Sequence, residues 1–167
     1  MSGCATRRDG QVDRPAPSYG RAVARDDGVT AGVGVARREV VDHALQRRAA
    51  LVDLRTGRVS RWEACDASPY LVRAAERLGV AVDRPCPVCR STLREVLWVY
   101  GAAVGDADGT ARTPGQVEAL ARAHPDLAVY EVEVCPSCGW NCLLRTWRTG
   151  TPGTPAARRS RRTAADP

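Results

Sequence analysis

Two Cys-Pro-x-Cys pairs constrain the fold of this chain more than any other feature of its sequence. Cys86 and Cys89 form the first pair, and Cys135 and Cys138 form the second. Two thiolates separated by two residues can hold one metal ion from a tight turn, and two such turns facing each other complete a tetrahedral site. The sequence therefore predicts that these four cysteines hold one structural zinc ion.

The residues around each pair favour such turns. A proline follows the first cysteine of both pairs, and it restricts the backbone at the start of the turn. Gly139 follows the second pair and can adopt the positive φ that this turn favours. Arg90 stands at the matching position of the first pair. We expect a small backbone strain at Arg90.

Sequence typical of β-strands adjoins both pairs. Residues 92–101 follow the first pair, 127–134 precede the second pair, and 141–148 follow it. Residues 113–124 open on Thr-Pro and predict a helix between the first two strands. This order of turns and strands is typical of a three-stranded antiparallel zinc ribbon, here with a helical insert.

The segment 127–134 alternates with the period of a strand. Tyr130, Val132 and Val134 face one way, while Val129 and the two glutamates between these residues, Glu131 and Glu133, face the other. This pattern predicts a half-buried strand.

Two helices are predicted before the first cysteine pair. Residues 36–55 place Val40, Val41 and Leu45 with other apolar residues in one arc, and Arg48 lies near the middle of that arc. Arg48 can pack its stem on the core, or it can grip a partner or an anion. Residues 68–78 form the second helix, with Ser68 as its cap, a proline at its first position and a glycine after its end.

Three other chemistries compete for the four thiols. A thioredoxin-like redox motif needs one pair at a strand-to-helix junction, whereas both pairs here run into strand sequence. A rubredoxin-like iron site uses the same ligands, so iron is not excluded. Disulfides are the third alternative. A site closed by four thiolates leaves no position for water or substrate, so we expect no enzyme activity and no small-molecule substrate.

The remaining cysteines carry less information. Cys142 lies four residues after Cys138 and can either exchange into the ligand set or pack as a small apolar residue near it. Cys65 is expected to be a buried thiol in a turn between helices. Cys4 lies in the segment 1–35, which we expect to be disordered.

Composition limits the core and the choice of partner. The 167 residues include no Phe, Ile or Lys, and all 25 basic residues are arginine. Much of the 44% apolar content is alanine and valine, which bury little area, so a metal is a suitable staple. Such residue choices are typical of a GC-rich genome. The number of arginines alone is therefore no evidence for nucleic-acid binding.

Charge and hydropathy suggest three segments in a cytoplasmic protein. Residues 1–35 are expected to be disordered, 36–149 to form one helical and zinc-ribbon domain, and 150–167 to form a disordered basic tail. The run ARRSRR at 157–162 can neutralise several phosphates or simply keep the tail in solution. No apolar run is long enough for a membrane span, and the start lacks the apolar region of a secretion signal.

Few other residues suggest a site. His43 and His124 have no nucleophile or carboxylate at a diagnostic spacing. The stretch GDADG at 105–109 lacks the closing glutamate of a calcium loop and is expected to be a turn. The chain has four tryptophans, and most are expected to pack in the core. Trp140, beside the second cysteine pair, is the best candidate for an exposed one.

Several longer stretches resemble a known family. These are REVVDHALQRRAAL, CDASPYLVRAAERLG, the two cysteine pairs, ARTPGQVEALA and CGWNCL, and the resemblance extends over roughly residues 36–148. They are similar to an uncharacterised actinobacterial family of small proteins, a domain of unknown function. The resemblance implies Cys86, Cys89, Cys135 and Cys138 as metal ligands. Members of the family usually carry histidine at the position of Cys142, and no activity comes with the resemblance.

The sequence thus predicts an α+β fold in which an N-terminal helical pair packs on a zinc ribbon. The favoured function is a non-enzymatic adaptor that contacts RNA, DNA or a nucleic-acid machine such as the ribosome or a polymerase. A protein-binding module without nucleic-acid contact is the first alternative, and a redox or iron-binding protein is the second.

Overall fold

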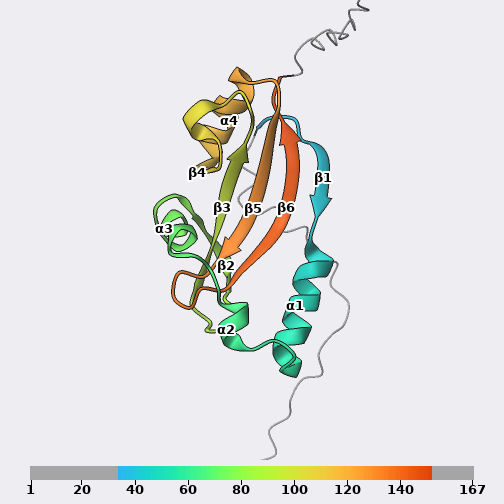
Figure 1. The fold of residues 1–167 in the computed structure, drawn as a ribbon, viewed down its shortest axis with the longest axis vertical. Coiled ribbons are helices and arrows are strands. Elements are labelled where there is room, and N and C mark those ends of the chain that lie inside the picture. Colours follow the sequence, from blue (N-terminus) through green and yellow to red (C-terminus); the bar gives the residue numbers. More distant parts are fainter. Residues whose placement is uncertain (1–33, 152–167) are drawn as a thin grey trace, which may run out of the picture.

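The computed structural model describes residues 34–151, which form an antiparallel sheet of six strands with four α-helices around it (Figure 1). The elements are β1 (Arg38–Asp42), α1 (Ala44–Thr56), α2 (Arg61–Ala64), α3 (Pro69–Leu78), β2 (Val80–Pro85), β3 (Thr92–Tyr100), the 3₁₀-helix η2 (Gly105–Ala107), β4 (Thr110–Arg112), α4 (Pro114–Ala123), β5 (Leu127–Val134) and β6 (Asn141–Thr149). Cys4 and the run 157–162 lie outside the described residues, as do nearly all residues of the two predicted tails.

The prediction of an α+β fold is confirmed, whereas that of a three-stranded ribbon is wrong. The strand order is β1-β6-β5-β3-β2, and β4 pairs with β3. The three predicted strands are the middle of this sheet. β1 extends it beside β6, and β2 and β4 pair with different stretches of β3. The extra strands pair the edges that a bare three-stranded ribbon leaves open.

The predicted helix 36–55 is wrong in its first part. Residues 38–42 form β1 and pair with β6, and α1 begins at Ala44, whose N–H donates to the Asp42 carboxylate over 2.6 Å. The adjacent β-branched residues Val40 and Val41 suit a strand, and the edge of β6 supplies its partner. Leu45 is 72% exposed, and Arg48 is exposed as well, so most of the predicted apolar arc faces solvent, although Leu51 of α1 packs toward the cysteines.

The two later helices begin where the sequence predicts. Ser68 caps α3 and Thr113 caps α4, each by accepting a backbone N–H, and a proline opens each helix. Gly79 ends α3, but in an extended conformation and not a left-handed one. A Cβ at this position would lie 2.5 Å from the carbonyl oxygen of Ala75, so the close passage of the chain requires glycine here.

The sheet is covered on both faces. One face, which we call the α4 face, packs Val99, Val129 and Trp147 against Val117 and neighbouring residues of α4. The other, the α3 face, packs β3 and β5 against α3, with Val96, Trp98 and Val134 among its buried residues.

The half-buried strand predicted for 127–134 is confirmed as β5, in which one face is completely buried and the other is mostly partly exposed. Glu131 and Glu133 lie on the α4 face and are completely buried, together with Val129, whereas Tyr130 on the α3 face is 38% exposed. Strand periodicity assigned these residues to two faces correctly. It did not indicate that the face with the glutamates is the more deeply covered one.

Figure 1 shows α4 near the upper end of the sheet, and α1 and α2 near its lower end, where β5 turns into β6. Within residues 34–151, no helix has the length and apolar content needed to cross a membrane.

Candidate metal centre

The four cysteines of the two pairs meet at the lower end of the sheet. The Sγ atoms of Cys86 and Cys138 are 3.7 Å apart, those of Cys89 and Cys135 are 3.5 Å apart, and all four lie within 4.8 Å of one another. Four sulfurs at the usual zinc–sulfur distance of about 2.3 Å sit about 3.8 Å apart in a tetrahedron. The spacing of the thiols therefore fits one ion at their centre.

The first turn is closed by two backbone hydrogen bonds. The N–H of Cys86 donates to the carbonyl of Ser91 over 2.8 Å, and the N–H of Arg90 donates to the carbonyl of Cys86 over 3.0 Å. Arg90 has a φ of 68°, in the left-handed region that glycine normally occupies. The strain predicted at Arg90 is present.

The second turn repeats this construction. Cys135 donates its N–H to the carbonyl of Trp140 over 2.8 Å, and Gly139 donates to the carbonyl of Cys135 over 2.9 Å. Gly139 has a φ of 82°, as its position after the second pair predicts. Two turns built alike, one at the start of β3 and one before β6, thus present two thiols each to a common centre.

The centre is shielded on the protein side. Cys86 and Cys135 are fully buried, and Cys89 and Cys138 are partly exposed. Apolar residues of three elements pack around the thiols: Ala50, Leu51 and Leu54 of α1, Ala64 of α2, and Trp140 of the second turn. A structural metal at this position would tie α1 and α2 to the end of the sheet.

The thiols differ in their affinity for protons. A hydrogen bond from the Ser91 side chain is the main cause that lowers the pKa of Cys89 to about 6. Burial raises the pKa of Cys135 and of Cys138. Since metal ligands must lose their protons, a cation at the centre would offset the cost of burying two thiolates.

Glu133 anchors the centre to the sheet. Its Oε1 accepts hydrogen bonds from the indole of Trp140 and from Arg47 of α1, both over 2.8 Å, and its Oε2 accepts one from Arg84 over 3.0 Å. Trp140 is 2% exposed, so the prediction that it is the exposed tryptophan is wrong. The buried carboxylate of Glu133 accepts the indole N–H of Trp140 and so allows this tryptophan to be buried. The sequence pattern did not show that Glu133 lies in the core.

Two more buried glutamates extend this network across the α4 face. Glu95 accepts a hydrogen bond from Arg84 over 2.6 Å, and Glu131 accepts one from Arg145 over 2.7 Å. Burial, and to a lesser extent the charge of Glu95, raises the pKa of Glu131 to about 7, although Arg145 opposes the shift.

Cys142 lies outside the four-thiol group. It packs beside the centre, and its thiol contacts the carbonyl of Leu143 at 3.5 Å. Burial, followed by the charge of Glu133, raises the pKa of Cys142 to about 11. Both observations fit a protonated packing residue better than a fifth ligand.

Comparison with known proteins places the chain in a family. The model of a family of unknown function (DUF5318) matches residues 35–164. The chain belongs to this family. The match extends past the described sheet into the arginine-rich stretch 157–162, which the resemblance seen in the sequence left out.

Members of DUF5318 with similar sequences come from mycobacteria, which confirms the actinobacterial resemblance. Uncharacterized protein Rv0049 of Mycobacterium tuberculosis and Uncharacterized protein Mb0050 of Mycobacterium bovis are each 38% identical to this chain over 137 residues. The alignments cover 75% of this chain and the whole of each relative. No solved structure matches this member of DUF5318.

Cys65 is the residue near the centre that the sequence analysis undervalued. Its Sγ lies 3.8 Å from the Sγ of Cys138. The N–H of Ala67 donates to the carbonyl of Gly139 over 3.0 Å, and Asn141 donates to the carboxylate of Asp66 over 2.9 Å. These contacts explain why CDAS and CGWN stand out together in the sequence.

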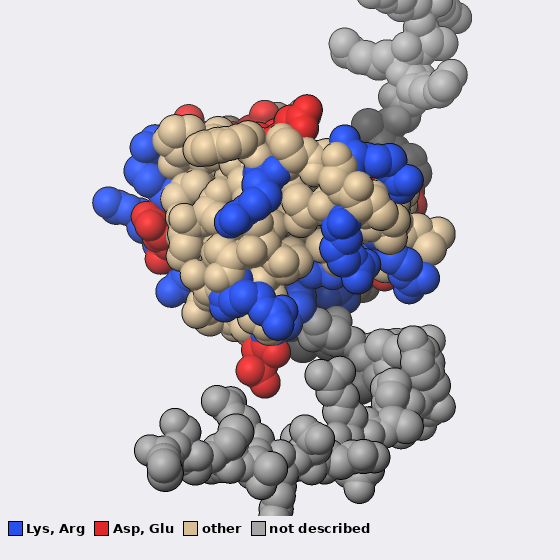
Figure 2. All heavy atoms as spheres, turned by 90° about the horizontal axis from the view of Figure 1, so that it is seen from below, with Lys and Arg blue, Asp and Glu red and all other residues tan. Residues whose placement is uncertain are grey.

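The exposed tryptophan is Trp62 on α2. It is 90% exposed, and with Arg61, Cys65 and Cys138 it lines a cavity of about 380 Å³. Figure 2 views the molecule from this end and shows arginine side chains spread over it, with acidic side chains mostly near the margin. The surface next to the centre is thus basic and carries one large aromatic ring.

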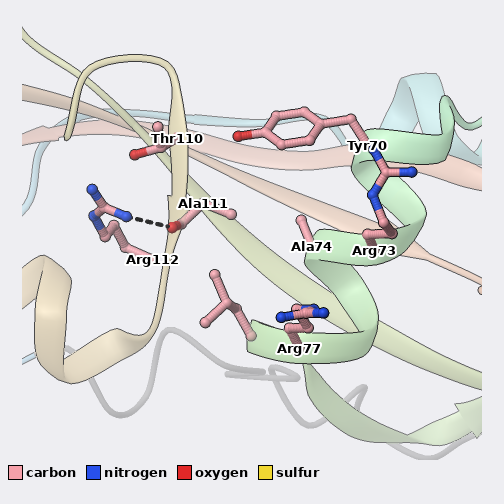
Figure 3. Close-up of a pocket in the computed structure, with 8 residues that line it drawn as sticks. Tyr70, Arg73, Ala74, Arg77, Thr110, Ala111 and Arg112 are labelled. Carbon is pink, nitrogen blue, oxygen red and sulfur yellow. Dashed lines mark hydrogen bonds between the residues drawn. The ribbon is translucent and has the colours of Figure 1, made fainter. Parts of the chain in front are cut away.

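A second concavity lies between α3 and β4 (Figure 3). Its volume is about 380 Å³, and three arginines line it: Arg73 and Arg77 of α3 and Arg112 of β4. The ring of Tyr70 extends from α3 toward Thr110, on the opposite side of the opening from Arg77. We call this concavity the arginine groove.

Within the described part of the chain, the arginines of this groove lack acidic partners. Arg112 donates to the carbonyl of Ala111 over 3.2 Å, and among residues 34–151 none of the three forms an ion pair. Most other arginines near the sheet have a carboxylate in reach, as Arg84 and Arg145 do. The groove therefore has an excess of positive charge. The sequence did not predict it, because β4 is a strand of three residues between the turn predicted at 105–109 and the helix predicted at 113–124.

Proposed function

We propose that this protein is a non-enzymatic nucleic-acid-binding protein in which one structural zinc ion is held by Cys86, Cys89, Cys135 and Cys138. The bound partner is single-stranded RNA or DNA. The observation that carries the choice of partner is the arginine groove, where three guanidinium groups with no acidic partner among residues 34–151 stand beside an aromatic ring.

The chemistry of the thiol set supports a structural zinc ion. Four thiolates at tetrahedral spacing suit zinc or an iron–sulfur site, and a closed set leaves no coordination position for a substrate. When bound, zinc would supply a rigid tetrahedral cross-link between the two turns. Burial of Cys86 and Cys135 and the packing of α1 against the site favour a role in stability.

The shape and charge of the arginine groove support the choice of nucleic acid. Arginine binds phosphate oxygens in bidentate geometry, and a tyrosine ring offers a face on which a base can stack. Ala74, Leu78 and Ala111 give the groove an apolar floor against which a base or sugar can lie. The volume of about 380 Å³ is within the range of small ligand sites and leaves room for one nucleotide.

Binding of labelled single-stranded oligonucleotides tests the partner. Fluorescence anisotropy with the zinc-loaded full-length protein should give a dissociation constant that rises steeply with salt. In the double variant Arg73→Ala/Arg77→Ala, the plot of log affinity against log salt should be shallower by about 1.4, because each single-strand phosphate contact contributes about 0.7.

Arg122→Ala is the matched control. Arg122 is exposed on α4 and pairs with Glu118, away from the groove, so its loss should leave the salt slope unchanged. The arginine run at 157–162 is present in every variant and contributes equally. No binding by the wild type, or the same salt slope in the double variant as in the wild type, would contradict a nucleic-acid site in the groove.

Native mass spectrometry tests the metal. Protein expressed without added metal should carry one zinc ion, and Cys86→Ser should lose the ion together with the ordered packing of the two turns and α2. A bound iron ion with visible colour would move the function to electron transfer. Wild-type protein that purifies without metal and keeps both turns and α2 ordered would contradict a structural zinc ion.

A protein partner is the second candidate, favoured by exposed aromatic residues on the α3 face. Tyr100 and Tyr130 are 43% and 38% exposed, and their rings meet edge to face at 5.1 Å. They line a hollow of about 340 Å³ together with Trp98, Val132 and Leu143. A partner that fills this hollow would bind mainly through apolar contact, so its affinity should change little with salt and fall in Tyr130→Ser.

A further inference from the structure

Cys65 occupies an unusual position beside the thiol centre. It is not one of the four grouped thiols, yet its Sγ lies 3.8 Å from Cys138, about as close as the grouped thiols are to one another. A thiol that served only as packing would not need to lie this close to Cys138. The position of Cys65 therefore calls for a chemical explanation.

The backbone holds Cys65 firmly against the second turn. A Cβ on Gly139 would lie 2.8 Å from the carbonyl oxygen of Cys65, so the glycine lets the two segments approach. The hydrogen bonds from Ala67 to Gly139 and from Asn141 to Asp66 fix the segment on both sides of the contact. Cys65 and Cys138 are thus held at a defined separation.

The surface opens at this pair of thiols. The cavity of about 380 Å³ lined by Arg61 and Trp62 has Cys65 and Cys138 in its wall. Cys86 and Cys135, by contrast, are completely buried. A small reagent from solvent therefore reaches the Cys65–Cys138 pair before it reaches the deeper thiols.

We propose that Cys65 and Cys138 form an oxidation site for peroxides, at which a reversible disulfide removes one ligand from the metal centre. At the loaded centre Cys138 is a thiolate and Cys65 a thiol, and with one hydrogen peroxide and one proton from solvent they give one S–S bond and two molecules of water. The O–O bond breaks, and the two electrons come from the two sulfurs. A dithiol reductant reverses the step by thiol–disulfide exchange.

The required movement is small. A disulfide has an S–S distance of about 2.05 Å, so the two sulfurs must approach by about 1.8 Å, which side-chain torsions can supply. The product leaves three thiols at the centre, and three thiols hold a metal less tightly than four. The weakening of metal binding rests on the proposed zinc site, whereas the formation of the disulfide does not.

Peroxide treatment of the zinc-loaded full-length protein tests the site. A chromogenic chelator follows zinc release, and tryptic mapping follows the disulfide. Cleavage after arginine places Cys65 alone in the peptide 62–73 and Cys138 in the peptide 123–145. Peroxide should link these two peptides, with Cys138 identified by fragmentation, and dithiothreitol should separate them.

Two variants complete the test. Cys65→Ser should bind one zinc ion like the wild type but release it about tenfold more slowly in peroxide, because a thiol held in contact reacts as an intramolecular partner. Cys142→Ser, which removes a nearby thiol outside the group, should release zinc at the wild-type rate. Equal release from Cys65→Ser and the wild type, or a disulfide that excludes Cys65, would overturn the proposal.

The proposal of a structural zinc ion and the proposal of an oxidation site can be contradicted independently. If the wild type contains no zinc, the structural-zinc function is wrong, but the link between the peptides 62–73 and 123–145 can still be scored. If zinc is present and peroxide leaves the two peptides unlinked, the oxidation site alone is wrong.

Discussion

At the scale of single residues, two positions in equivalent turns differ in a way that can be measured. Arg90 and Gly139 both have positive φ and close their turns with the same hydrogen bond. Glycine adopts this conformation without strain, whereas an arginine side chain adds about 1 kcal/mol or more. The two turns therefore contribute unequally to the stability of the centre.

We expect Arg90→Gly to raise the free energy of unfolding by about 0.5–1 kcal/mol, because relief of strain exceeds the added entropy of the unfolded chain. Gly139→Ala should lower it by about 1–3 kcal/mol, because a Cβ also meets the carbonyl of Cys65 at 2.8 Å. Urea unfolding of the metal-loaded protein measures both. A change of the same sign and size in the free energy of unfolding for both substitutions would contradict the difference in strain between the two turns.

Glu131 predicts a pH dependence of stability. Its pKa is about 7 in the folded protein, above the ordinary value of 4.5. Between these values the folded state binds more protons than the unfolded state, so this group contributes stability at low pH that is lost as pH rises toward and through 7. Glu131→Gln should show a smaller loss between pH 6 and pH 8 than the wild type does in urea unfolding. A parallel pH profile in the two proteins would contradict the shift.

The sequence predicted the grouping of the four cysteines better than it predicted their surroundings. The spacing of the two pairs and Gly139 carried enough local information to place four thiols together. Cys65 and Glu133 reach the centre through contacts between distant segments, and residue spacing does not encode such contacts. The burial of Trp140 was not predicted for the same reason. Its indole donates to Glu133 of β5, and the alternating pattern of β5 did not show which of its two faces is buried.

At the scale of secondary structure, α1 depends on the sheet more than on its own sequence. Its strongest described anchor is Arg47, which lies 25% exposed and donates to the fully buried Glu133. The next residue, Arg48, points to solvent and was the arginine that helical periodicity favoured. The difference arose because Val40 and Val41, which helped to define the predicted apolar arc, belong to β1, so the packed face of α1 is defined by other residues.

We expect Arg47→Ala to lower the free energy of unfolding by about 1–3 kcal/mol, since it removes one of three donors from a buried carboxylate. Arg48→Ala changes the same kind of side chain one residue later and should have an effect within about 0.5 kcal/mol. Thermal and urea unfolding of the two variants provide the comparison. A larger effect at Arg48 would mean that α1 is rotated relative to this description.

The elements that sequence patterns predicted well are those with strong local signals. Ser68 and Thr113 cap helices that begin with proline, and β3, β5 and β6 are rich in strand-forming residues. β1, β2 and β4 are short strands that gain their stability from pairing with neighbours. Their local sequence alone did not distinguish them from helix or loop.

At the scale of the whole molecule, the metal centre and the apolar core on the α4 face lie at different ends of the sheet. Val99, Val129 and Trp147 form a core that needs no metal, whereas the turns and α2 have few buried residues of their own. Loss of the metal should therefore act locally first.

We expect removal of zinc by a strong chelator to raise hydrogen exchange at 61–67, 86–91 and 135–140 while α4 and the upper parts of β3 and β5 stay protected. Hydrogen-exchange mass spectrometry of the loaded and stripped protein measures this directly. Uniform loss of protection would mean that the centre and the core unfold as one unit.

Both ends of the described chain attach to the same helix. Gly34 donates its N–H to the side chain of Glu118, and Thr151 donates to the carbonyl of Ala121, so residues 34 and 151 both lie beside α4. A label or surface linker attached at residue 34 or residue 151 would therefore lie beside α4, at the end of the sheet remote from the cysteines. Immobilised in this way, the protein would present Trp62 and the thiol cavity to solution, which suits it to partner capture and to peroxide sensing on a surface.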